Sequence, residues 1–241
     1  MEKIYFDKRG THVGLMLSFL IFIIFLIFLY TIIEPQIQSN GNKKAILDYI
    51  KYKMIENITA EVTITSIKVN KSAMPSGEDC FEIKQVIGGE KFVVKNETNK
   101  DVNASKRGND ILEIKSNSSK EEFFRVYYSN IFEKEEDNLN NCWKPEPKDY
   151  WIGLTKKVEY AFEKEIISLK NAHQDNYEGL KKDLNIPLGT EFSFSFTYEN
   201  GSIIKTAEKE VETDIYAEEI PLQYINERAD MGYGFLNIKV W

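Results

Sequence analysis

The most prominent pattern along the chain is a run of apolar residues close to its N-terminus. Residues 13–33 form 21 consecutive positions without a formal charge, and their only polar members are Ser18, Tyr30 and Thr31. As a helix rising about 1.5 Å per residue, the run is about 31 Å long and matches the roughly 30 Å hydrocarbon core of a bilayer. A buried core helix is the competing interpretation, but such helices rarely stay apolar on every face. The run therefore predicts a transmembrane helix.

A cleavable secretory signal is a second alternative for this run. The apolar region of such a signal is typically about 7–15 residues long and ends in small residues. Here the run is longer, and it leaves through Ile32, Ile33, Glu34 and Pro35. We therefore expect the helix to stay on the mature chain.

The segment that follows the run predicts a break and then a short helix. Residues 34–42 read EPQIQSNGN, in which Pro35 disfavours helix and the last four residues are typical of a turn. Over residues 43–56 apolar side chains recur at three- and four-residue steps, which predicts a short amphipathic helix. Its apolar stripe consists of Ile46, Leu47, Ile50, Met54 and Ile55. Residues 34–57 are therefore expected to form a stalk.

From residue 58 the apolar period changes to two, which is typical of half-buried strands. Strand candidates lie within residues 58–69, 111–114, 123–128, 150–162, 192–198, 203–204, 215–216 and 235–241. Residues 82–95 predict a hairpin that turns at Gly88 and Gly89, and Asn200 and Gly201 predict a second turn. Residues 99–110 and 133–141 are polar and are expected to be loops.

One long helix is expected over residues 163–184, because Ile166, Leu169, His173, Tyr177, Leu180 and Leu184 share one face and Pro187 ends the pattern. Mostly antiparallel strands with one long helix predict a single α+β domain over residues 58–241. The chain is thus divided into a cytoplasmic segment (1–12), a transmembrane helix (13–33), a stalk (34–57) and an extracytoplasmic domain.

The orientation follows from the basic residues near the two ends of the apolar run. Lys3, Lys8 and Arg9 precede it, whereas the first basic residue after it is Lys43. Loops rich in Lys and Arg stay on the cytoplasmic side, so the N-terminus is predicted to be cytoplasmic and the large C-terminal part exported. The net charge of −7 argues against a nucleic-acid partner, which requires clustered Lys and Arg.

Two further features favour export. Six N-x-S/T sequons lie downstream of the apolar run, at Asn57, Asn70, Asn96, Asn103, Asn117 and Asn200. They suggest a glycosylated surface, although Asn, Ser and Thr also cluster in turns for structural reasons. The two cysteines, Cys80 and Cys142, both lie on the exported side and could form one disulfide that closes a long loop.

Residues that carry catalytic chemistry are sparse. His12 lies at the membrane edge, and His173 lies on an apolar helix stripe, where a local structural partner is the simplest expectation. The sequence carries no recognised metal-binding or nucleotide-binding motif, so no cofactor, metal site or enzyme activity is expected. The carboxylates of Glu133, Glu135, Glu136 and Asp137 are most simply a solvated loop; a paired-acid hydrolase or a weak calcium site is the alternative.

The residues around the start of the apolar run resemble a known signal. Lys8, Arg9 and Gly10 directly precede THVGLMLSFLIFIIFLIFLY, an arrangement similar to the class III signal peptide of archaeal type IV pilin-like proteins and archaellins. In that family a prepilin peptidase cuts after the glycine, and the apolar helix then packs with other copies in a filament core. The resemblance implies cleavage between Gly10 and Thr11, and assembly with itself or with other pilin-like subunits. Leu15 stands where bacterial pilins carry a glutamate, which archaeal members often lack.

Two further segments, LKKDLNIPLGTEFSFSF and the closing GFLNIKVW, resemble parts of uncharacterised archaeal single-pass membrane proteins. The first functional expectation is therefore an extracellular structural or interaction protein, a pilin-like subunit anchored in the lipid bilayer. A monomeric anchored domain that binds a ligand or partner at the cell surface is the alternative, and an anchored hydrolase comes third.

Overall fold

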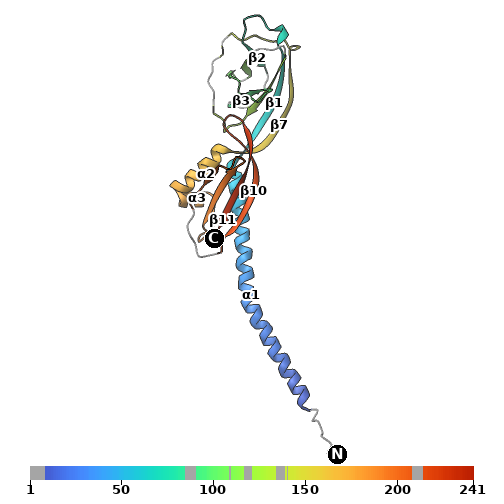
Figure 1. The fold of residues 1–241 in the computed structure, drawn as a ribbon, viewed down its shortest axis with the longest axis vertical. Helices are drawn as coiled ribbons and strands as arrows, with labels where there is room; N and C mark the ends of the chain where they lie inside the picture. Colours follow the sequence, from blue (N-terminus) through green and yellow to red (C-terminus); the bar gives the residue numbers. More distant parts are fainter. Residues whose placement is uncertain are drawn as a thin grey trace, which may run out of the picture.

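The computed structural model describes residues 9–84, 91–108, 110–116, 121–133, 139, 141–207 and 214–241. One long helix projects from an elongated domain in which the strands form a twisted sheet (Figure 1). We call the part of the domain around the end of this helix the proximal half and the opposite end the distal half. The fold is α+β with mostly antiparallel strands, as the sequence predicts.

Helix α1 (Arg9–Ile58) is continuous over 50 residues. The predicted break over residues 34–42 is therefore wrong, and the expected transmembrane and amphipathic helices are one helix. A proline inside a helix costs about 3 kcal/mol, but a second helix start would require a second unfavourable nucleation. The helical segments 13–33 and 43–56 on either side of residues 34–42 thus favour one continuous helix.

The two ends of α1 have opposite environments. The window Val13–Thr31 is long and apolar enough to cross a membrane, and none of it is buried in the protein. At the other end Leu47, Ile50, Met54 and Ile58 are buried in the core of the domain. The predicted apolar stripe over residues 43–56 is therefore the face by which α1 joins the domain.

The main sheet has eight strands in the order β3-β6-β1-β7-β10-β11-β8-β9. Its strands are β1 (Thr59–Asn70), β3 (Phe92–Asn96), β6 (Glu121–Tyr128), β7 (Tyr150–Phe162), β8 (Phe192–Tyr198), β9 (Ile203–Lys205), β10 (Tyr216–Ile225) and β11 (Met231–Val240). All neighbours are antiparallel except β7 and β10, which are parallel and share only two residue pairs. The two halves of the sheet therefore meet at a narrow junction.

A second sheet of three strands, β2 (Cys80–Lys84), β5 (Ile111–Lys115) and β4 (Ala104–Arg107), lies in the distal half. The predicted hairpin over residues 82–95 is wrong, because β2 pairs with β5 whereas β3 pairs with β6. Phe81 and Ile83 of β2 share a core with Phe92 and Val94 of β3, so the two strands belong to facing layers. Gly88 and Gly89 lie outside the described residues.

Two other local predictions also require correction. The polar segment 99–110 contains strand β4, whose Ala104 and Ser105 are buried. The helix expected over residues 163–184 is two helices, α2 (Glu163–Asp175) and α3 (Tyr177–Asp183). Asn176 leaves the helical conformation, and its side chain accepts a hydrogen bond from the backbone of Gly179, so it caps the start of α3.

One face of the main sheet is covered along its length. In the distal half the second sheet packs on it, and in the proximal half the end of α1, α2 and α3 do so. On the opposite face, a smaller core at the junction includes Phe132, Phe162 and Ile225. We call this second face the uncovered face, because side chains at both of its ends, among them Trp151 and Phe235, are exposed. Since successive residues of a strand point to opposite faces, the strand register shows which side chains lie on it.

Candidate interaction surfaces

The apolar part of α1 is the largest exposed apolar surface of the described chain. Phe22 and Phe25 are 54% and 53% exposed, and their apolar neighbours along the helix are exposed to a similar extent. The Thr31 hydroxyl donates to the carbonyl of Phe28, so this polar group is satisfied within the helix. An exposed apolar surface of this kind is typical of a membrane or protein interaction site. Gly10 and Thr11, the residues of the predicted cleavage site, lie in the first turn of α1.

At the distal end of the uncovered face, three side chains form a row across three strands. Lys68 of β1 is in register with Phe123 of β6 on one side and with Trp151 of β7 on the other. The Lys68 ammonium lies 5.3 Å from the ring centre of Phe123 and 5.6 Å from that of Trp151, within the range of cation–π attraction. Phe123 and Trp151 are 48% and 52% exposed. We call these three residues the distal row.

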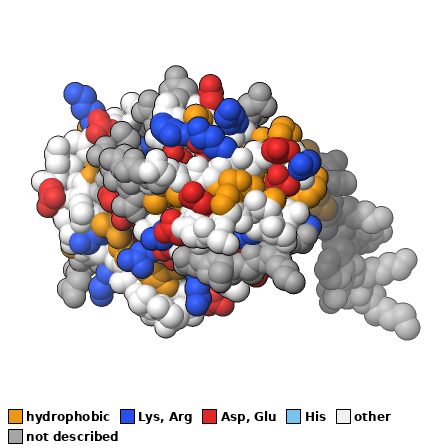
Figure 2. Space-filling model, turned by 90° about the horizontal axis from the view of Figure 1, so that it is seen from above, with side chains coloured by type: hydrophobic (Ala, Val, Ile, Leu, Met, Phe, Trp, Pro, Cys, Tyr) orange, Lys and Arg blue, Asp and Glu red, His pale blue; other side chains and the backbone are white. Residues whose placement is uncertain are grey.

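The surface around the distal end is mixed in charge. Viewed from above, Lys and Arg side chains alternate with Asp and Glu, and hydrophobic patches lie between them (Figure 2). Within the distal row the local charge is positive, and Arg125 of β6 is exposed beside it. Exposed aromatic rings beside cations are typical of surfaces that bind partners or ligands.

At the proximal end of the same face, side chains form two rows that each cross four strands. The first row, in strand order, is Pro221, Phe235, Thr197 and Ile203. The second row is Glu219, Asn237, Ser195 and Lys205. Phe235 and Ile203 are 44% and 58% exposed, and Glu219 and Lys205 at the ends of the second row are exposed as well. We call these eight residues the proximal face.

One polar atom in the proximal face is unsatisfied. The side-chain oxygen of Asn237 is shielded from solvent and accepts no hydrogen bond from any described residue. A buried acceptor without a donor typically costs about 1–3 kcal/mol.

A buried cation ties the distal half to the turn between β10 and β11. Lys95 of β3 is 1% exposed, and its ammonium lies 2.8 Å from a carboxylate oxygen of Asp101 and 2.5 Å from one of Asp230. Burial alone would lower the pKa of Lys95, but its hydrogen bonds to the two aspartates outweigh that effect and raise the pKa. Burial likewise opposes ionisation of Asp230, yet Lys95 and Asn226 hold the pKa of its carboxyl below 3.8. The group is a charged contact at the junction between the halves.

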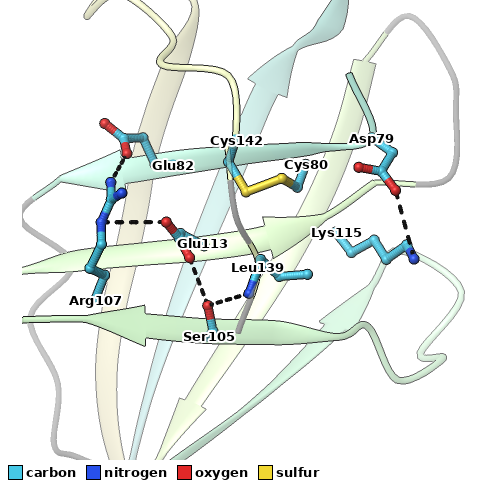
Figure 3. Close-up of a disulfide and its surroundings, with 9 residues drawn as sticks. All are labelled: Asp79, Cys80, Glu82, Ser105, Arg107, Glu113, Lys115, Leu139 and Cys142. Atoms are coloured by element: carbon cyan, nitrogen blue, oxygen red, sulfur yellow. Dashed lines mark hydrogen bonds and ion pairs between the residues drawn. A yellow bond between two sulfur atoms is a disulfide. The ribbon is translucent and has the colours of Figure 1, made fainter. Parts of the chain in front are cut away.

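Cys80 and Cys142 form a disulfide with a Cα–Cα distance of 4.8 Å (Figure 3). It fixes the segment before Trp143 on β2, where Trp143 and Cys80 also share a backbone hydrogen bond. Beside it, on the outer side of the second sheet, Glu82 and Glu113 lie opposite one another and both are buried. Arg107 pairs with both carboxylates, and the Ser105 hydroxyl donates to Glu113 at 2.8 Å (Figure 3). The second oxygen of Glu113, Oε1, accepts no hydrogen bond from the described residues and has only the ion pair with Arg107 at 3.4 Å.

The sequons lie in different environments. Asn57, Asn103 and Asn200 are exposed, Asn70 and Asn96 are half-buried, and Asn117 lies outside the described residues. In three of them, Asn70, Asn96 and Asn200, the side-chain oxygen accepts a hydrogen bond from the backbone two residues on. These asparagines therefore also shape turns, and whether any carries a glycan stays a prediction.

The residues considered for catalysis have structural surroundings. His173 is buried, and its Nε2 lies 3.0 Å from the carbonyl oxygen of Phe192. Glu133 forms an ion pair with Lys164 at 3.0 Å, whereas Glu135, Glu136 and Asp137 lie outside the described residues. Within the described ranges, no group of three or more His, Cys, Asp or Glu side chains is placed to hold a metal ion. The side chain of His12 is not described.

Sequence patterns alone missed the proximal face and the distal row. Both depend on which residues of non-adjacent strands lie in register, and that pairing leaves no local signal in the chain. Alternation of apolar and polar residues in 192–198 predicts the strand but not its neighbours. No family model, no curated protein and no solved structure matches this chain.

Proposed function

We propose that this chain is a membrane-anchored, extracytoplasmic structural protein that assembles through α1, in the manner of a pilin-like filament subunit. The observation that carries the proposal is that α1 is one continuous helix whose apolar part is exposed and whose C-terminal end is buried in the domain. The apolar window Val13–Thr31 has no partner in the described chain, whereas Ile50, Met54 and Ile58 of the same helix are completely buried. Contacts made by the apolar part are therefore rigidly connected to the domain.

The direction of insertion follows from charge. Basic residues precede the apolar window closely, and the domain follows it, so the domain lies outside the cytoplasm. The apolar side chains of the window are Phe, Leu and Ile, which pack through van der Waals contacts. Copies anchored side by side can associate through these side chains once the segment before Thr11 is removed.

The test is to weaken the apolar surface without changing its polarity. In the full chain, Phe22→Ala combined with Phe25→Ala should lower the yield of filaments or membrane oligomers by about tenfold or more, because two exposed rings are truncated. Phe22→Leu with Phe25→Leu is the matched control and should retain assembly. Thermal unfolding of the domain should be the same in all three chains, since both positions are remote from its core. Unchanged assembly in the alanine variant would contradict the proposal.

A monomeric surface receptor is the second candidate function, and the distal row favours it. Phe123, Lys68 and Trp151 offer two exposed rings and a cation at the end of the domain farthest from α1. An uncut N-terminus together with a monomeric state in detergent would support this candidate over the first.

A further inference from the structure

The proximal face is an uncovered part of the main sheet whose two rows run across β10, β11, β8 and β9 in that order. We propose that it is a contact between two copies of this chain, related by a two-fold axis parallel to the strands. The inference goes beyond the proposed function, because it concerns the domain and not the apolar part of α1.

The charged row is complementary to itself under such a two-fold axis. When two copies face each other, the axis reverses the strand order, so β10 of one copy lies opposite β9 of the other. Glu219 on β10 then faces the partner's Lys205 at one end of the row, and the same pair recurs at the other end. Both side chains are exposed, and both lie in register in one row. Opposite charges meet at both ends of the contact.

The middle of the same row is polar on both copies. The reversed strand order places β11 of one copy opposite β8 of the other. Asn237, whose side-chain oxygen accepts no hydrogen bond among the described residues, then faces the partner's Ser195. A serine hydroxyl can donate to that oxygen. Both side chains are neutral and polar, so the middle of the row adds no charge repulsion to the contact.

The apolar row also fits its own reversed copy. Phe235 lies opposite the partner's Thr197, and Ile203 lies opposite the partner's Pro221, so a large side chain meets a small one at the centre. Two sheets that pack face to face are about 10 Å apart, and alternation of large and small side chains fills that space. The exposed fractions of Phe235 and Ile203, 44% and 58%, represent apolar surface that this packing would bury.

The orientation agrees with anchoring in one membrane. Strands β10 and β11 run alongside the upper part of α1 (Figure 1). A two-fold axis parallel to these strands therefore leaves α1 of both copies pointing the same way. The end of α1 packs on the opposite face of the sheet, so the contact does not use the apolar part of the helix.

The test uses charge reversal in the full chain, solubilised in detergent and carrying two different affinity tags. Lys205→Glu or Glu219→Lys alone should weaken self-association by about tenfold, because each change places like charges together at both ends of the contact. Mixing the two single variants should restore association, because every facing pair is then opposite in charge. Lys100→Glu, an equal change of charge at an exposed distal position, is the control and should associate like the natural chain.

The mixing step separates a specific contact from a loss of folding, since an unfolded variant cannot be rescued by another. A mixture that associates no better than either variant alone would overturn the proposal. Association that is unchanged in both single variants, or a natural chain that is monomeric, would overturn it too. Repeating the measurement in chains with Phe22→Ala and Phe25→Ala shows which surface is involved, because failure of α1 assembly leaves the charge-dependent contact in place.

Discussion

The disulfide between Cys80 and Cys142 allows a stability change to be worked out from the chain itself. The two cysteines are 62 residues apart in sequence. Cross-linking two points at this separation lowers the entropy of the unfolded chain by about 14 cal/mol/K, which is about 4 kcal/mol at 25 °C. We therefore expect reduction of the disulfide to lower the free energy of unfolding by about 4 kcal/mol. For a domain of this size each kcal/mol shifts the melting temperature by about 2–4 °C, so the shift should be about 8–16 °C.

The assay compares urea and thermal unfolding of the full chain with and without reductant. The variant Cys80→Ala with Cys142→Ala should unfold at the same point in both conditions. Because the effect acts on the unfolded chain, reduction should also increase the dependence of stability on urea, as the unfolded state becomes more expanded. A melting shift below about 3 °C on reduction would refute the reasoning, because the segment around Cys142 would then be held by other contacts.

Three further changes test the structure. Met54→Ala should lower the free energy of unfolding by about 2–5 kcal/mol, because Met54 is completely buried. Tyr52→Ala, at a position 62% exposed, should change the same free energy by less than about 1 kcal/mol. Equal effects of the two changes in urea unfolding would contradict the packing of α1. Gly234→Ala should lower the free energy of unfolding by about 1–3 kcal/mol, since a Cβ there would overlap the ring of Phe196. An unchanged melting temperature would contradict that close approach. Asp230 contributes stability that is present above its unfolded pKa and is lost as the pH falls through its lowered folded pKa. Acidification from about pH 6 to about pH 3 should therefore destabilise the natural chain more than it destabilises the variant Lys95→Met. Equal acid sensitivity of the two chains would contradict the charged contact.

Elements whose apolar pattern is local were predicted correctly from the sequence. The range 150–162 is strand β7, and alternation in 192–198 with the turn at Gly201 gives β8 and β9. His173 lies on the predicted helix stripe and has a structural partner, but this partner, the carbonyl of Phe192, is on β8 and is not local as expected. For these strands, the residues that determine the element are its own neighbours in sequence.

Elements that depend on distant contacts were not predictable in the same way. Pro35 and the turn-like residues after it indicate a break when they are judged alone, but the helix continues because residues 13–33 and 43–56 on either side are helical. The glycines at 88 and 89 suggested that β2 and β3 pair. Instead the two strands belong to different sheets, and the apolar faces of β2 and β3 pack against each other. The proximal face arises only when β8, β9, β10 and β11 are placed in register. Sequence patterns predict which side chains are apolar, but not which strand lies next to which.

Intact-mass analysis of the chain purified from its own membranes tests the central claim most directly. A pilin-like subunit is processed between Gly10 and Thr11, so the account predicts a mature chain that begins at Thr11. A chain that still begins at Met1 would contradict the pilin-like function, and the anchored receptor would then be the better explanation of the same fold.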